Sequence, residues 1–293
     1  MTRRLNAEGA NAVEGRVVLD LGKSVWVLGT GLASASALLL SSWDVAHIGV
    51  AVALTGLSLC CGHSVGLHRV VIHEAARLPR WLEYGLVWLA VVAGIGGPLS
   101  LVQHHELRDW AQRGQRESHP WLGHQQPFHR DLPEQVAWRI ELVHPPEIVL
   151  EDRLRLDPFY RLMEASWPLQ NLPIALAAWA WGGWEALAWI VGVRVFLSVV
   201  MHQVVGWLAH NVGEQHEVAP EASVQGFNLP VLGFLSFGEG WHNNHHAHPE
   251  SARLGLAEGE WDPGWWFLQL LERIGLAHDV VEARLEAPAR SAA

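Results

Sequence analysis

The sequence predicts an all-α integral membrane protein, with four transmembrane helices in two hairpins, a re-entrant or interfacial helix, and a cytoplasmic histidine-rich cap. Three observations predict this fold. Hydrophobic residues make up 50% of the 293 residues and charged residues only 17%, whereas soluble domains carry about a quarter charged residues. Long apolar runs recur along the chain. Histidines gather between and after these runs.

The first predicted hairpin consists of the apolar runs Val25–Leu40 and Val45–Gly62, which the short segment Ser41–Asp44 connects. A spanning helix needs about 20 mostly apolar residues. The second predicted hairpin consists of Asn171–Trp181 and Ala186–Gly206. Trp lies at both turns, as expected where aromatic rings sit at the membrane interface.

A further apolar run, Trp81–Val102, is predicted not to cross the membrane. Glu83 and the stretch Gly94–Pro98 weaken a spanning helix here, since Pro and Gly disfavour a helix interior. A crossing would also place the histidines before and after the run on opposite sides. We therefore expect a re-entrant or interfacial helix beneath the cap.

The basic residues predict which side the cap occupies. None of the 20 Lys and Arg residues lies in either hairpin turn, and cytoplasmic loops carry an excess of these residues. The histidine-rich side is therefore expected to be cytoplasmic. We expect a polar N-terminal tail over residues 1–24, a membrane domain over 25–278 and a C-terminal tail over 279–293.

Charge and cysteine content exclude other classes of protein. The net charge of −10 argues against a nucleic-acid partner, which needs a basic surface. The only cysteines, Cys60 and Cys61, are adjacent and apolar in context, so a disulfide framework is excluded. The segment Met1–Lys23 is polar and mixed in charge, and no cleaved signal peptide is apparent in it.

Histidine spacing predicts a metal site. Three histidines near the carboxyl end stand at i, i+3 and i+4, a spacing that gathers side chains on one helix face, and imidazoles are common metal ligands. The candidate ligands are His68, His73, His104, His105, His210, His242, His245 and His246. Eight histidines are too many for a single ion, so two metals are expected. His202 is expected to be a hydrogen-bonded interior residue, and His119, His124 and His129 are expected to be solvated or capping.

This arrangement resembles the integral-membrane fatty acid desaturases, in particular bacterial relatives of the acyl-CoA Δ9 desaturases. The resemblance runs from about Gly62 to Ala277. It is most specific in Gly238–Pro249 and the following Ser251–Leu256. The pair His68 and His73 resembles the first histidine box of the family, and His242–His246 resembles the third.

The second box departs from the family pattern, which is usually His-x-x-His-His. Leu101 stands at the first ligand position here, and an apolar side chain cannot bind a metal. His63 could supply a substitute, a water could fill the position, or the metal site could be weakened or altered. Asp109, one helical turn after His105, could orient that imidazole as a hydrogen-bond acceptor.

Two further positions differ from the family. Family members tend to carry Asn four residues before the histidine that ends the last span, where this chain has Gly206, with Asn211 directly after His210 instead. Glu106 replaces a residue that is usually basic.

The resemblance implies an O2-dependent oxidoreductase of the acyl-CoA desaturase type. Such an enzyme holds two iron ions and introduces a cis double bond into a long acyl chain, with two electrons from outside. A CoA conjugate is expected, and carrier-protein or glycerolipid conjugates stay open. The sequence shows no fused cytochrome b5, iron–sulfur or dinucleotide motif, so a separate reductase with ferredoxin or a cytochrome b5-type carrier is implied.

Two alternatives stay open from the sequence. A related di-iron membrane hydroxylase or monooxygenase would share the histidine boxes and differ in its product. A non-catalytic lipid-binding protein could keep the fold, with the Leu101 replacement as its signature.

Overall fold

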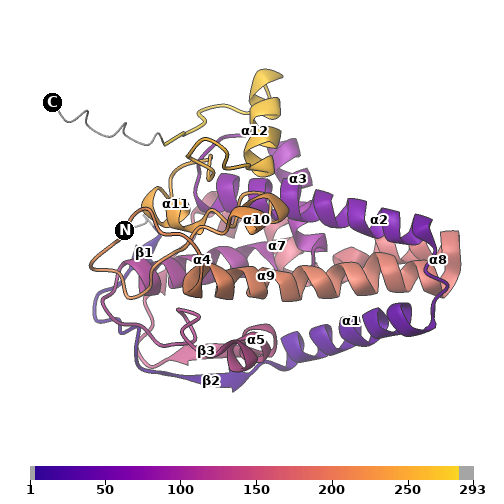
Figure 1. The fold of residues 1–293 in the computed structure, drawn as a ribbon, viewed down its shortest axis with the longest axis horizontal. Coiled ribbons are helices and arrows are strands. Elements are labelled where there is room, and N and C mark those ends of the chain that lie inside the picture. Colours follow the sequence, from indigo (N-terminus) through magenta and orange to yellow (C-terminus); the bar gives the residue numbers. More distant parts are fainter. Residues whose placement is uncertain (1–3, 284–293) are drawn as a thin grey trace.

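The computed structural model describes residues 4–283 and consists mostly of helices (Figure 1). The helices are α1 (Leu21–Leu40), α2 (Val45–Gly56), η1 (Leu57–Ile72), α3 (Arg80–Val92), α4 (Pro98–Arg113), α5 (Phe128–Ala137), α6 (Asp152–Arg155), α7 (Pro158–Ser166), η2 (Trp167–Asn171), α8 (Leu172–Leu187), η3 (Ala188–Val193), α9 (Arg194–Asn211), α10 (Pro230–Leu235), α11 (His242–Ala247) and α12 (Pro263–Arg273). The strands are β1 (Leu5–Asn6), β2 (Gly15–Leu19), β3 (Trp138–Leu142) and β4 (Glu147–Ile148).

Capping aspartates start both helices of the first hairpin. The Asp20 carboxylate accepts a hydrogen bond from the Lys23 N–H at 3.0 Å, and Asp44 accepts one from the Ala46 N–H at 2.7 Å. Such side chains satisfy amides that have no partner within the helix. α2 continues directly into the π-helix η1, so the second arm is longer than predicted.

Within residues 4–283, three helical runs are long and apolar enough to cross a membrane: Leu21–Leu40, Val45–Ile72 and Pro158–Asn211. Only 17% of the most apolar window in each of the first two runs is buried within the protein. Leu28 and Leu32 of α1, for example, are exposed. An outer surface of this kind suits contact with lipid, as predicted for a membrane protein.

The third run turns back on itself at a pair of glycines. Gly183 has a φ of 62° and a ψ of −148°, a conformation that only glycine adopts readily, and a Cβ on Gly182 would collide with the His47 imidazole. After this break the chain packs back along α8, α1 and α2 (Figure 1). The predicted second helical hairpin is therefore present.

The two hairpin turns lie together, at the end of the molecule away from α11 (Figure 1). Oε2 of Glu185 in the second turn accepts hydrogen bonds from the Ser42 amide at 3.1 Å and from the Ser42 hydroxyl at 2.6 Å. These contacts fix the hairpins to each other at the end opposite the histidines.

The predicted embedded helix is α3, which has 13 residues. A helix of that length measures about 20 Å, less than the roughly 30 Å of a membrane core. α3 packs closely along η1, where a Cβ on Gly62 would collide with the α3 backbone. The chain turns at Gly94, which has a φ of 81°, before α4 begins.

Four short strands depart from the all-α prediction. β2 pairs antiparallel with β3, and β1 pairs antiparallel with β4. Residues 5–19 therefore pack on the connector between α4 and α7 (residues 114–157), which follows the second histidine box. The pairing partners lie more than 100 positions apart in the sequence, so local patterns did not indicate them.

Arg4 anchors this N-terminal segment in the interior. Its guanidinium donates hydrogen bonds to Glu106 at 3.0 Å, to the carbonyls of Val71 and Ile72 at 2.9 and 2.7 Å, and to Glu151 at 2.9 Å. Buried charges need such partners. The unexpected acid at position 106 is therefore the counter-charge of Arg4, and the contacts join the end of η1 to α4 and the connector.

Candidate metal centre

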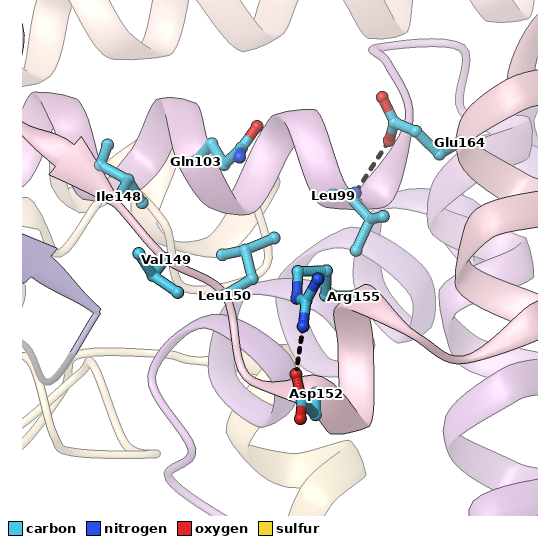
Figure 2. Close-up of a pocket in the computed structure, with 8 residues that line it drawn as sticks. All are labelled: Leu99, Gln103, Ile148, Val149, Leu150, Asp152, Arg155 and Glu164. Carbon is cyan, nitrogen blue, oxygen red and sulfur yellow. Dashed lines mark hydrogen bonds and ion pairs between the residues drawn. The ribbon is translucent and has the colours of Figure 1, made fainter.

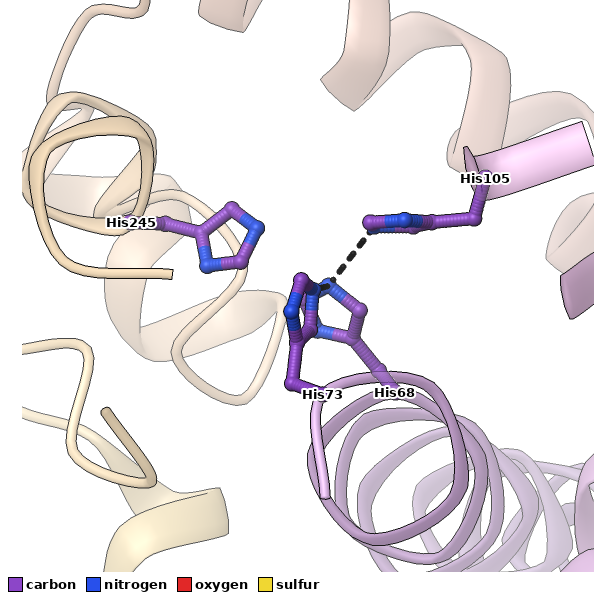
Figure 3. A group of neighbouring side chains, drawn as sticks. All are labelled: His68, His73, His105 and His245. Atoms are coloured by element: carbon purple, nitrogen blue, oxygen red, sulfur yellow. Dashed lines mark hydrogen bonds between the residues drawn. The ribbon is translucent and has the colours of Figure 1, made fainter. Parts of the chain in front are cut away.

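The first histidine cluster brings together four imidazoles from three helical regions. η1 supplies His68, its C-terminal end supplies His73, α4 supplies His105, and α11 supplies His245 (Figure 3). One ring nitrogen from each lies within 4.8 Å of the corresponding nitrogens of the others. Nε2 of His68 lies 3.2 Å from Nε2 of both His73 and His105. The four rings therefore converge on one point.

The π-helix explains the spacing of the first pair. In an α-helix, residues five apart differ by about 140° around the axis. In η1 the hydrogen bonds run from i to i+5, and the His73 N–H donates to the His68 carbonyl at 3.0 Å. Residues five apart consequently lie closer together around the axis than in an α-helix, and both imidazoles face the cluster.

A carboxylate orients His68. Oε2 of Glu239 lies 2.9 Å from Nδ1 of His68, and Oε1 accepts a hydrogen bond from the Ser64 hydroxyl at 2.6 Å. Burial alone would raise the pKa of Glu239, yet the neighbouring His68 and Arg69 lower it to about 2. The negative charge beside Nδ1 favours a proton on that nitrogen and leaves the Nε2 lone pair directed at the cluster, as in metal-binding histidines.

The charge state of these rings fits a metal site. Burial lowers the pKa of His105 to about 4, despite the opposing effect of Asp109. Burial also lowers the pKa values of His73 and His245 well below the ordinary 6.5. His73, His105 and His245 are therefore neutral at pH 7, which is the form that binds metal. The donor set fits an ion that prefers nitrogen ligands.

The second cluster contains His210 from α9 and His242 and His246 from α11, again with one ring nitrogen each within 4.8 Å of the others. Nδ1 of His210 donates to the Gln225 carbonyl at 3.0 Å. This contact directs Nε2 toward the cluster, where it lies 3.1 Å from Nε2 of His242. Three imidazole nitrogens therefore fit a second ion.

Both clusters depend on the short helix α11. His245 belongs to the first cluster and its neighbours at i−3 and i+1 belong to the second. Oδ1 of Asn228, a fully buried residue, accepts hydrogen bonds from the amides of Asn243 and Asn244 at 3.0 and 3.3 Å. The asparagines between the histidines thus fix the start of the helix, and the two sites are adjacent.

A buried ion pair fixes η1 to the start of α12. Arg69 donates to Asp262 at 2.8 Å, and both side chains are almost fully buried. Asp262 also accepts a hydrogen bond from the Leu254 amide at 2.8 Å. Through Asp262, the Ser251–Leu256 segment that follows the third box is therefore linked to Arg69 of η1.

The clusters bring together seven of the eight predicted ligands, and His104 lies outside both. Nε2 of His104 accepts a hydrogen bond from Nε of Arg108 at 2.8 Å, and its ring packs edge-on against Trp121. The guanidinium therefore occupies the lone pair that would bind a metal. Leu101 packs against the apolar core.

The three predicted supporting residues take other positions. Asp109 lies 3.8 Å from Nδ1 of His105, too far for a hydrogen bond, and accepts one from Arg113 at 2.7 Å. His63 packs against His202, with ring centroids 4.9 Å apart, and belongs to neither cluster. Asn211 donates to the backbone carbonyl of His124 at 2.9 Å.

Sequence reasoning missed two residues of this region. Glu239 was not singled out, although it lies only three positions before His242. The expectation of a solvated or capping His124 was wrong, because this residue is 3% exposed and its ring stacks on that of His210. The sequence around His124 is rich in polar residues and glycine, so it predicted an exposed segment. The burial of His124 depends instead on the packing of α5 against α9.

Residues 44–271 of the chain match the family described as Fatty acid desaturase. The chain belongs to this family. It is 30% identical to the sn-1 stearoyl-lipid 9-desaturase of Anabaena variabilis, over 88% of this chain and 92% of that protein. It is 31% identical to the sn-2 palmitoyl-lipid 9-desaturase of Nostoc sp. (strain 36), over 84% and 86%, and 27% identical to the icosanoyl-CoA 5-desaturase of Limnanthes douglasii, over 89% and 72%.

Family membership makes this protein an oxidoreductase that desaturates fatty acids. The three apolar helical runs agree with the membrane protein predicted from the sequence. His68 lies in the last part of the second run, His73 directly follows that run, and His210 lies at the end of the third.

Proposed function

We propose that this desaturase holds two irons and uses O2 and two external electrons to introduce a cis double bond into a long acyl chain. The observation that carries the proposal is the pair of adjacent, partly buried clusters, with four and three imidazoles, in a member of the desaturase family. When bound, iron would supply the oxygen activation needed to attack an unactivated methylene, which redox-inert zinc cannot supply.

The overall reaction removes two hydrogens from adjacent carbons and forms one carbon–carbon double bond. O2 accepts two electrons from the acyl chain and two from the external donor, and with two further protons it becomes two waters. The seven clustered histidines would hold the metals, and Glu239 and the Gln225 carbonyl orient two of them. A ferredoxin or a cytochrome b5-type carrier with its reductase is the proposed donor.

We further propose four membrane crossings with the metal centre on the cytoplasmic side. The break at Gly182–Gly183 divides the third apolar run into two arms, which with the first two runs gives four. The two hairpin turns lack Lys and Arg and lie at the end away from α11. The positive-inside rule then favours a cytoplasmic position for the opposite end.

The charges of the protein favour a membrane glycerolipid as the acyl carrier over the CoA conjugate expected from the sequence. The phosphates of CoA would need several unpaired cations, because phosphate recognition rests on Arg and Lys. Most arginines among residues 4–283 instead pair with a carboxylate, as Arg113, Arg116 and Arg130 do. A glycerolipid with an uncharged headgroup makes no such demand.

The pocket between α4, α6 and α7 supports the same argument. It has a volume of about 470 Å³ and lies beside Gln103 (Figure 2). Arg155 is its only basic lining residue, and Arg155 pairs with Asp152 at 2.7 Å, with Glu164 on the opposite rim. A pocket with more acid than base is unsuited to a polyphosphate.

The test is mass spectrometry of lipids, with location of double bonds, in a host that expresses the protein and a matching electron donor. A new unsaturated acyl chain should appear with the wild type and not with His245→Ala/His246→Ala. The exposed His129 provides a matched control, because His129→Ala should leave the product unchanged. Purified protein given stearoyl-CoA or a stearoyl glycerolipid in nanodiscs then identifies the carrier.

Other outcomes distinguish the alternatives. A hydroxylated chain would identify a hydroxylase that shares the site. Absence of any product, in a protein that holds no iron, would contradict the proposal and favour a non-catalytic lipid-binding role.

A further inference from the structure

The two clusters differ in the number of histidines they contain. The first has four imidazoles and the second has three. His104, the other histidine that the sequence offers for this purpose, is engaged by Arg108 at 2.8 Å. The second cluster therefore lacks one nitrogen relative to the first, unless another residue supplies it.

His124 lies directly beside the second cluster. Its ring stacks on that of His210, with centroids 5.7 Å apart and planes inclined by 15°. This separation is no greater than the 6.2 Å between the rings of His105 and His245, which share the first cluster. The ring of His124 is thus a close neighbour of the second cluster, although its nitrogens do not lie within 4.8 Å of all three ligand nitrogens there.

The hydrogen bonds of His124 leave one nitrogen available. Nδ1 lies 2.8 Å from Oδ2 of Asp131, a fully buried carboxylate. An acceptor there keeps the proton on Nδ1 and the lone pair on Nε2, which is how second-shell carboxylates prepare histidines for metals. Among residues 4–283, no side chain or backbone group makes a hydrogen bond to Nε2 of His124.

The backbone holds His124 in an unusual conformation. Its φ is 54°, in the left-handed region that residues other than glycine seldom adopt. Strain of this kind persists where surrounding contacts enforce it, and it often marks functional positions. The side chain of Asn211, next to His210, enforces it by donating to the His124 carbonyl at 2.9 Å.

A glycine makes room for the imidazole. Gly206 lies one helical turn before His210 on α9, and a Cβ at this position would lie 3.0 Å from Nε2 of His124. That contact is tighter than side chains normally tolerate. The absence of a side chain at Gly206 therefore allows Nε2 to approach the same face of α9 from which His210 projects.

We propose that His124 is the fourth protein ligand of the second metal site, that Asp131 orients it, and that His104 does not bind this metal. The inference rests on the proposed di-iron function. His124 and Asp131 lie in and next to the segment that connects α4 to α5, so the second site takes a ligand from outside the histidine boxes.

The test measures iron in the full-length protein purified with 57Fe, by elemental analysis and Mössbauer spectroscopy. His124→Ala and His210→Ala should each lose the iron of the second site and keep the other. His104→Ala and the exposed control His129→Ala should keep both irons. X-ray absorption should show fewer imidazole nitrogens per iron in His124→Ala.

Two further variants separate ligation from folding. Imidazole added to His124→Ala should restore the lost iron if the variant is folded and lacks only a ligand. Gly206→Ala keeps every histidine and should reduce occupancy of the second site, because its methyl group crowds Nε2.

Three results would overturn the inference. It fails alone if His124→Ala keeps both irons with an unchanged spectrum while His210→Ala loses one. The inference is also wrong if His104→Ala, rather than His124→Ala, loses an iron, because the second histidine box would then supply the ligand. It fails together with the di-iron proposal if the wild type, purified with iron, binds none.

Discussion

The two histidine clusters are adjacent and share α11, but they are assembled differently. The first takes His68 and His73 from one continuous π-helix and orients His68 through Glu239. The second takes one histidine from the end of α9, orients it through a backbone carbonyl, and lies against a strained connector residue. One site is built from regular structure and the other depends on an irregular segment.

This difference shows that histidine boxes predict ligands well only where one element carries them. Spacing within η1 or α11 fixes which side chains share a face. The second cluster depends on how α5, α9 and the connector pack together, which spacing does not specify. Variants that affect only one cluster therefore test whether the two sites are independent.

The largest effect is expected from removing a ligand of the first cluster. His245→Ala should lose that iron and reduce activity by at least the roughly 100-fold that loss of a mere orienting partner can cost. The second cluster should keep its iron, because the two sites share no ligand. Mössbauer spectra and product formation are the measurements, with His248→Ala just beyond α11 as the control. Loss of both irons in His245→Ala would show that the sites are not independent.

A smaller effect, on stability, is expected from Arg4→Met. This change leaves Glu106 buried without its counter-charge, and breaking a buried pair costs about 3–5 kcal/mol. Unfolding by denaturant in detergent measures the loss, and Arg4→Met/Glu106→Met should recover most of it. Iron should be lost first from the first cluster, because Arg4 holds the end of η1. Equal loss from both clusters would contradict this assignment.

Glu239→Gln should weaken iron binding at the first cluster by about 10–100-fold and leave the second unchanged. The amide keeps the size of the side chain but removes the negative charge beside Nδ1 of His68. Competition with a chelator measures the affinity. Glu250→Gln, at an exposed position, is the matched control, and a similar loss in that variant would mean that the general negative charge is responsible.

The smallest effect is a dependence of stability on pH in the metal-stripped protein. Folded His105 has a pKa of about 4, below the roughly 6.5 of an unfolded histidine. Between these values the unfolded state binds a proton that the folded state does not, so stability should fall as the pH falls from 6.5 to 4. His105→Gln should show a shallower slope of unfolding midpoint against pH than the wild type. An equal slope in both proteins would show that His105 is not responsible for the dependence of stability on pH.

Much of the fold followed from the sequence because membrane helices are encoded locally. Apolar length located both hairpins, and Gly94 and Pro98 correctly indicated that the stretch Trp81–Val102 does not continue as one helix. The strands were missed because each pairs with a segment far along the chain. Their registers depend on tertiary structure, as in the pairing of Val17 with Ile140.

The site was predicted in outline and missed in detail for related reasons. Neighbouring residues in a box were assumed to act together, yet His105 faces the first cluster while His104 faces Arg108. The ring of His104 turns away from the clusters because Arg108, four positions later, donates a hydrogen bond to it. Glu239 and His124 were missed because their roles arise only once η1, α9 and the cap meet.

The contacts of Arg4 have a consequence for how the chain is made. Its partners at positions 106 and 151 are synthesised more than 100 residues later, so the N-terminal segment cannot reach its place until both helices of the first hairpin have left the ribosome. During translation the amino end can dock only after Glu151 has been synthesised. A tag joined at the amino end would lie close to the contacts of Arg4 with Glu106 and Glu151. Affinity tags for purification therefore belong at the carboxyl end.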